Sequence, residues 1–154
     1  MIVAWRLVKQ RHQATAFDGE GARRVGGRWN PTGTRVVYLS DSLALAALET
    51  FVHLGRAALQ IAHVAFRTEI PDNVPITTIA DAELPPGWRS EPPSDVTKQV
   101  GSDWVTRAQT VVLRVPSVIV PNESNLVLNP AHPDFARLQI FPAEPFHFDP
   151  RMWK

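Results

Sequence analysis

The stretch RVVYLSDSLALAALETFV, residues 35–52, passes from a strand pattern to a helix pattern within a few residues. Residues 35–39 are rich in β-branched and aromatic side chains, which predicts a strand. Strong helix formers fill residues 41–52, and Ser40 or Asp41 is available as the helix cap. The stretch therefore predicts a strand that runs directly into a helix.

Within the predicted helix, one carboxylate lies close to the apolar side. At 100° per residue Leu45, Leu48 and Val52 share a stripe, and Glu49 lies at its edge rather than on the opposite, solvated face. Tyr38, the only tyrosine in the chain, ends the preceding strand eleven residues earlier. The two side chains could converge on one site. The alternative is a core tyrosine and an exposed carboxylate.

Outward from this stretch, the remaining patterns predict more strands than helices. The predicted strands cover residues 2–8, 58–67, 110–115, 117–121, 124–128 and 138–148, the last broken by Pro142 and Pro145. Residues 95–106 predict a second helix and residues 133–136 a single helical turn. Because regular crossover helices do not separate the strands, we expect an α+β fold with a mixed or antiparallel sheet.

The 154 residues match the usual size of one domain, and we expect residues 1–154 to form a single one. Six of the fourteen prolines fall between Pro71 and Pro93. Residues 71–94 are therefore expected to form a long surface loop or lid inserted in that domain. Trp5, Trp104 and Phe135 are expected in the core.

Composition narrows the class of protein. The chain is 44% hydrophobic and 20% charged, as is typical of soluble domains, and it has no cysteine. Disulfides, thiolate nucleophiles and cysteine-ligated zinc are excluded, and a reducing compartment fits. Without a basic leader or a long apolar run, a cytoplasmic location is expected, with no membrane association.

Charge is distributed unevenly along the chain. Residues 1–35 hold seven Arg or Lys against two acids, whereas residues 36–154 hold nine against thirteen. Clustered arginines favour a site for phosphate or carboxylate. A solvated basic loop is the alternative. Because the whole chain carries a net charge of only +1, direct nucleic-acid binding is not expected.

The loop Gly26-Gly27-Arg28-Trp29-Asn30 lies between the first two predicted strands. Paired glycines permit backbone conformations and close approaches that other residues forbid. Arg28 could hold a phosphate while the Trp29 indole stacks on a flat ring. The alternative is a glycine-rich turn anchored by a partly buried Trp29.

Five motifs follow one another in the order expected of a known family. They are Gly26-Gly27-Arg28-Trp29-Asn30, Val37-Tyr38-Leu39-Ser40, Ala47-Leu48-Glu49-Thr50, Leu113-Arg114-Val115-Pro116-Ser117 and Asn129-Pro130-Ala131-His132-Pro133. Between about Trp5 and Phe141 the chain resembles the RES domain. The Arg, Glu and Ser that name this family match Arg28, Glu49 and Ser117.

The resemblance implies a fold similar to ADP-ribosyltransferase toxins and an enzyme that degrades NAD+. Family members include NAD+ phosphorylases, so inorganic phosphate is the expected co-substrate and no cofactor is expected. The resemblance also implies that the protein is the toxin of a bacterial toxin–antitoxin pair. Its antitoxin would be a helical protein of the Xre type that occludes the active site.

A mechanism can be assigned to these residues as a hypothesis. Cleaving the bond to nicotinamide builds positive charge on the ribose carbon, which the Glu49 carboxylate would stabilise. Arg6 and Arg28 would hold the pyrophosphate or the attacking phosphate, and Tyr38 would contact the nicotinamide ribose. Ser117 would position substrate without acting as a nucleophile. Trp29 and Asn129 complete the expected substrate-binding set.

Two other functions remain open: transfer of ADP-ribose to a macromolecule, and a non-catalytic module that binds a nucleotide or an acidic partner. Metal catalysis is not expected, because the five histidines are scattered with no paired ligand spacing. For His132, we expect a structural hydrogen bond near the helical turn.

Overall fold

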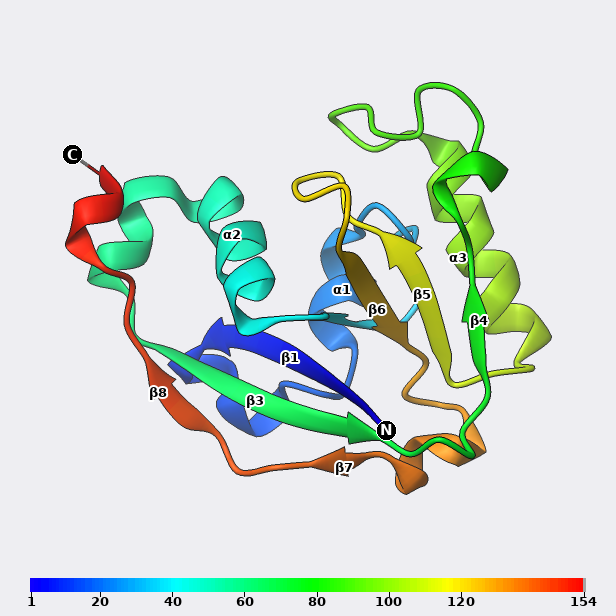
Figure 1. The fold of residues 1–154 in the computed structure, drawn as a ribbon, viewed down its shortest axis with the longest axis horizontal. Helices are drawn as coiled ribbons and strands as arrows, with labels where there is room; N and C mark the ends of the chain where they lie inside the picture. The colour runs from blue at the N-terminus through cyan, green and yellow to red at the C-terminus, as the bar shows by residue number, and fades with distance from the viewer. Residues whose placement is uncertain (154) are drawn as a thin grey trace.

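Eight strands pair into one sheet in the computed structural model, which describes residues 1–153 (Figure 1). The strand order is β4-β5-β6-β2-β1-β3-β7, and β8 also pairs with β3. The β4–β5 pair is parallel and the other pairs are antiparallel. The predicted α+β fold with a mixed sheet is confirmed. The strands are β1 (Ile2–Lys9), β2 (Val37–Ser40), β3 (His63–Ile70), β4 (Ile76–Thr78), β5 (Val112–Pro116), β6 (Ser124–Leu128), β7 (Gln139–Ile140) and β8 (Glu144–Phe146).

The sheet has two parts that meet at the short strand β2. Figure 1 shows β1, β3, β7 and β8 in one part and β4, β5 and β6 in the other, at a steep angle. β2 pairs with β6 along its whole length, but its described pairing with β1 is confined to Trp5↔Ser40. Beyond that pair the strands diverge, and Arg6 bridges them by donating from Nη1 to the carbonyl oxygen of Tyr38 across 3.0 Å.

Three α-helices accompany the sheet: α1 (Glu20–Val25), α2 (Leu43–Leu54) and α3 (Asp95–Arg107). α2 packs on β1 and lies over the β1–β3 part in Figure 1. The side chain that caps α2 is Ser42, whose Oγ accepts from the Leu45 N–H at 3.0 Å. The prediction of Ser40 or Asp41 as cap was wrong, because both residues bond to β6 instead. Short 3-10 helices are η1 (Gln10–Thr15), η2 (Gly55–Gln60), η3 (Asp81–Glu83), η4 (Pro133–Arg137) and η5 (Pro150–Trp153).

Apolar side chains cover both faces of the central strands. In β6, Leu126 and Leu128 join one core cluster, while Val127 joins the other with Trp29 and Trp104. This alternation follows from the two-residue period of a strand. The expected burial holds for Trp104, while Phe135 is partly buried against the first cluster and Trp5 is half-buried outside the clusters.

The predicted stripe on α2 is buried only at its beginning. Leu45 is fully buried and Leu48 is half-buried, whereas Val52 is 55% exposed. Near the end of the helix Phe51 packs on η5 instead, where its ring centroid lies 4.5 Å from that of Trp153.

Three strand predictions need correction. Residues 117–121 form a turn, because Ser117 Oγ accepts from the backbone N–H groups of Ile119 and Val120 and so bends the chain. The predicted strand at 58–67 begins at His63, since residues 55–60 form η2. The closing strand at 138–148 is divided into β7 and β8, although Pro145 lies inside β8. Residues 71–94, predicted to be irregular, include β4 and η3.

Candidate active site

The Glu49 carboxylate is held against the sheet by two side chains from the β5–β6 hairpin. Glu49 is half-buried near the middle of α2. Its Oε1 accepts from Asn125 Nδ2 at 2.7 Å and from Ser117 Oγ at 3.3 Å. Within residues 1–153 no hydrogen bond reaches Oε2. One carboxylate oxygen is therefore fixed, and the other is left available.

Ser117 lies just past the end of β5 and is fully buried. Its hydroxyl donates to Glu49 and accepts from the Ile119 and Val120 N–H groups at 3.1 Å each. The backbone N–H of Ser117 donates to the Glu123 carbonyl oxygen, which closes the turn. The geometry brings the family's Glu and Ser together, and the serine hydroxyl is directed at Glu49.

Sequence reasoning missed Asn125 and Ser40. They are cross-strand partners in β6 and β2, and Ser40 Oγ donates to Asn125 Oδ1 at 2.8 Å. Ser40 is 4% exposed, so this bond is shielded from water. An asparagine near the start of a short strand gives no signal by itself; only the strand register shows that it faces Ser40.

A second group of polar contacts fixes the start of α2 to the same hairpin. Asp41 accepts from the Ser124 N–H at 2.8 Å and pairs with Arg114 at 3.4 Å. Ser42 donates to Glu123 Oε1 at 2.8 Å. Because the helix start and the hairpin are joined in this way, the position of Glu49 relative to Ser117 is set by the fold.

Arg28 holds the proline-rich segment. Its Nη1 donates to the carbonyl oxygens of Trp88 at 2.9 Å and Ser90 at 2.8 Å, and Nη2 pairs with Glu91 at 3.1 Å. The Arg28 side chain is only 15% exposed. Among the described residues, no hydrogen bond or ion pair joins Arg28 to Glu49.

Tyr38 and Trp29 pack the glycine-rich loop. Tyr38 Oη donates to Asn30 Oδ1 at 2.6 Å and accepts from the Trp29 N–H at 3.1 Å. A Cβ on Gly27 would lie 2.7 Å from that oxygen, which explains the glycine. Trp29 is 2% exposed and lies beside the Trp88 ring. Burial raises the pKa of Tyr38 well above its usual value, so the phenol stays protonated.

The structure gives Arg6 two backbone partners. Nε donates to the Ala16 carbonyl oxygen at 2.6 Å and Nη1 to that of Tyr38. Burial lowers the pKa of Arg6 to about 10, which is partly offset by the nearby charge of Asp18. The guanidinium therefore keeps its charge at neutral pH while it bridges β1 and β2.

Asn129 lies away from Glu49. It follows β6 at the end opposite Asn125, about 13 Å away along a strand that rises about 3.3 Å per residue. Its Oδ1 accepts from the Ala131 N–H. The hydrogen-bonding expectation for His132 is confirmed, since its ring contacts the Ala108 carbonyl oxygen and the Asp134 N–H.

Four of the seven basic residues among the first 35 form ion pairs within the described chain. Arg23, Arg24 and Arg35 all form ion pairs with Glu20. Hydrogen bonds from Arg23, with the charge of Arg35, lower the pKa of Glu20 to about 2. These three arginines thus help to fix α1 through a single carboxylate.

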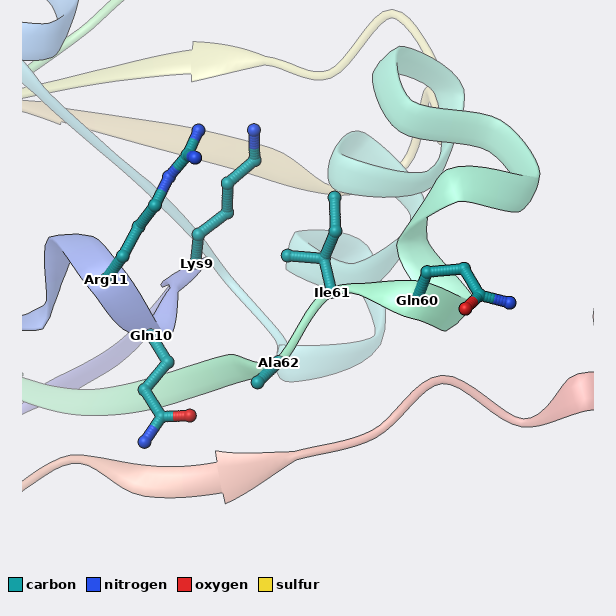
Figure 2. A pocket seen from close by; sticks show the side chains of 6 residues that line it. All are labelled: Lys9, Gln10, Arg11, Gln60, Ile61 and Ala62. Carbon is teal, nitrogen blue, oxygen red and sulfur yellow. The ribbon is translucent and has the colours of Figure 1, made fainter.

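Two surface hollows lie away from these residues. One, of about 460 Å³, lies between the end of β1 and the start of β3 (Figure 2) and is lined by Lys9, Gln10, Arg11, Gln60, Ile61 and Ala62. The other, of about 510 Å³, lies on α3 beside Asp95 and Asp103. Neither includes a residue assigned to chemistry above.

Residues 1–153 contain neither a metal-binding cluster nor a membrane-spanning helix. No group of three or more His, Asp or Glu side chains has a geometry that could hold a metal ion. None of the described helices has the length and apolar character required to cross a membrane.

The fold and site define an α+β domain in which a helix carboxylate is fixed by the ends of two sheet strands. The chain belongs to the RES domain family, whose pattern matches residues 3–149. The recognised resemblance is thereby confirmed.

Similar proteins come from several bacteria. A "Prs ADP-ribosylating toxin" of Sphingobium sp. (strain YBL2) is 41% identical, with 96% of this chain and 94% of that protein covered. A "Toxin Res" of Yersinia enterocolitica is 37% identical, with 98% and 99% covered. A "Toxin Res" of Pseudomonas putida is 34% identical, with 99% and 100% covered.

A solved structure shares the fold. It is a chain of the Mycobacterium tuberculosis MbcT–MbcA toxin–antitoxin complex, with a TM-score of 0.78 at 20% identity. The match covers 95% of this chain and 84% of that one.

Proposed function

We propose that this protein is the toxin of a toxin–antitoxin pair and that it cleaves the bond between nicotinamide and ribose in NAD+. Membership of the RES family and full-length relatives named as toxins support the first part. The Glu49 carboxylate, fixed at Oε1 and unoccupied by hydrogen bonds at Oε2, carries the second.

The chemistry needs a fixed negative charge. As the bond to nicotinamide breaks, positive charge develops on the ribose carbon and ring oxygen, and a preorganised carboxylate stabilises it without reorienting. Oε2 of Glu49 would face the sugar and accept a hydrogen bond from a ribose hydroxyl that strengthens in the transition state. Nicotinamide leaves as a neutral molecule, so no strong general acid is required.

Arg28 is the residue we assign to the pyrophosphate. Its planar guanidinium suits two parallel bonds to phosphate oxygens. It would have to exchange the carbonyl oxygens of Trp88 and Ser90 for phosphate, so segment 88–91 would move when NAD+ binds. Tyr38 would act by holding the loop that carries Arg28.

The remaining candidates have no assigned contact with substrate. Arg6 is engaged with two backbone carbonyls, Trp29 is buried in the core, and Asn129 caps a turn beyond the far end of β6. Ser117 is assigned to Glu49 rather than to substrate, since its hydroxyl proton is directed there.

Two acceptors for ADP-ribose are favoured by different observations. The family resemblance implies inorganic phosphate, which would give ADP-ribose-1-phosphate. The name of the 41% identical relative favours transfer to a macromolecule. Both reactions share the cleavage step assigned to Glu49.

We also propose an antitoxin of the helical Xre type as partner, covering the Glu49 site. The resemblance implies it, and the similar fold was solved with an antitoxin bound.

The test incubates purified protein with NAD+ labelled in the adenylate part, with and without inorganic phosphate, and separates small products from macromolecules. ADP-ribose-1-phosphate formed only with phosphate identifies a phosphorylase, and free ADP-ribose a glycohydrolase. Label on a macromolecule added from a cell extract identifies a transferase. Binding of NAD+ with no nicotinamide released would overturn the proposal in favour of a binding module.

A further inference from the structure

We propose that Asn125 is a positioning residue that orients Glu49 for catalysis, and that Ser40 restrains the Asn125 amide in this place. The inference rests on the proposed function. It follows from one chain of hydrogen bonds, Ser40 Oγ to Asn125 Oδ1 at 2.8 Å and Asn125 Nδ2 to Glu49 Oε1 at 2.7 Å.

The direction of this chain follows from the groups themselves. An ionised carboxylate can only accept hydrogen bonds, so Asn125 must present its NH2 group to Glu49. The amide oxygen then faces Ser40, which satisfies it by donating its hydroxyl proton. With the amide flipped, the amide oxygen would face the Glu49 carboxylate with no donor between them, whereas Ser40 Oγ could still accept from Nδ2.

Asn125 restrains Glu49 more tightly than Ser117 does. The Asn125 contact at 2.7 Å is short for N–H···O, whereas the Ser117 contact at 3.3 Å is long for O–H···O. Ser117 also accepts from two backbone N–H groups, so its place is set by the turn at 117–120. The rotation of the carboxylate, and thus the direction of Oε2, depends chiefly on Asn125.

Strand pairing makes this restraint rigid. Ser40 and Asn125 are opposed in the β2–β6 ladder, and Ser40 is almost fully buried. A site built on strands holds its geometry better than one built on loops. A misplacement of about 1 Å in a reacting group can cost about 100-fold in rate.

The decisive variant is Asn125→Asp, which keeps the shape and replaces the donor by an acceptor. Near neutral pH we expect kcat for nicotinamide release to fall about 100-fold, with KM for NAD+ changed less than about threefold. Two adjoining carboxylates share a proton as the pH falls, and the protonated member can donate. The loss of kcat in Asn125→Asp should therefore become smaller toward about pH 5.5. A purely structural defect would not give this pH response.

Two further variants complete the test. Ser40→Ala removes the hydrogen bond that restrains the amide but leaves the donor to Glu49, and should lower kcat about tenfold. Asn122→Asp adds the same charge at an exposed position in the neighbouring turn and should keep wild-type kcat. Wild-type kcat for Asn125→Asp across the pH range would overturn the proposal.

A second measurement needs no turnover. The two Asn125 Nδ2 protons, assigned in ¹H–¹⁵N spectra by their loss in Asn125→Asp, should shift upfield in Glu49→Ala and respond to Ser40→Ala. If wild-type protein turns over NAD+ but the chemical shifts of these protons are unchanged in Glu49→Ala, only the positioning role is overturned. If they respond but wild-type protein releases no nicotinamide, the proposed function fails and the catalytic role of Asn125 falls with it.

Discussion

Arg28 donates from Nη1 to the carbonyl oxygen of Trp88 across 2.9 Å, linking positions 60 residues apart. The arginine that names the family is thus bound to backbone oxygens in this conformation. The same fork of donors that suits phosphate also suits two carbonyls and a carboxylate. Release of segment 88–91 is the step that would free it.

Replacing Arg28 should loosen that segment. Arg28→Ala removes three contacts to residues 88–91, and we expect the free energy of unfolding to fall by about 1–3 kcal/mol, with faster proteolysis within residues 84–94. Urea denaturation and limited proteolysis measure both effects. Glu91→Gln is the matched control: the Glu91 side chain is 73% exposed, so losing its charge should cost less than about 1 kcal/mol. Equal rates of proteolysis for Arg28→Ala and wild type would contradict the conclusion that Arg28 holds residues 88–91 in place.

Gly101 allows α3 to contact the Trp29 backbone. A Cβ there would lie 1.6 Å from the Trp29 carbonyl oxygen, so Gly101→Ala must displace the helix and should cost at least about 3 kcal/mol. Gly21→Ala in α1 is the control, because nothing lies within 4 Å of its added Cβ. That change should raise stability by up to about 1 kcal/mol. Thermal unfolding compares the two, and similar effects from both substitutions would speak against this packing.

The phenol of Tyr38 should contribute to stability through its hydrogen bonds. Tyr38→Phe leaves Asn30 Oδ1 and the Trp29 N–H without this partner in a buried place. We expect a loss of about 1–3 kcal/mol in the free energy of unfolding, measured with denaturant. A change below about 0.5 kcal/mol would show that the loop does not depend on this oxygen.

Acid should weaken the contacts around α1. Since the folded-state pKa of Glu20, about 2, lies below its ordinary 4.5, the ion pairs stabilise the protein fully above about pH 4.5. This contribution is lost as the pH falls toward 2. Glu20→Gln should therefore have a lower Tm than wild type near neutral pH, and the two should converge in acid. High salt should reduce the difference, because these charges are near the surface. A constant difference down to pH 2 would contradict the assignment.

Local patterns predicted α2, α3 and most strands, but neither α1 nor β4. The β-branched run ending at Leu39 and the helix formers from Leu43 are strong signals, and α3 differs from its predicted range by one residue. The errors arose where a side chain overrides propensity. Ser117 bends an apolar segment that otherwise matches a strand, and the cap shifted to Ser42 because β6 binds Ser40 and Asp41.

The site was only partly predictable. Helical periodicity placed Glu49 at the edge of the apolar face, and the family resemblance assigned Ser117 to the site as a residue that positions substrate. The hydrogen bond between Ser117 and Glu49, 68 positions apart, was not predicted. Asn125 and the partners of Arg28 required strand register and loop path, which single-sequence patterns do not contain. The expectation that Arg6 and Arg28 hold the pyrophosphate or the attacking phosphate stays a prediction.

Release of nicotinamide from NAD+ by wild-type protein and by Glu49→Gln tests the central claim most directly. Glutamine keeps the shape and can still accept from Asn125 and Ser117, but it carries no charge. With both proteins folded at the assay temperature, we expect the variant to be at least about 100-fold slower. Equal rates of nicotinamide release would contradict the account.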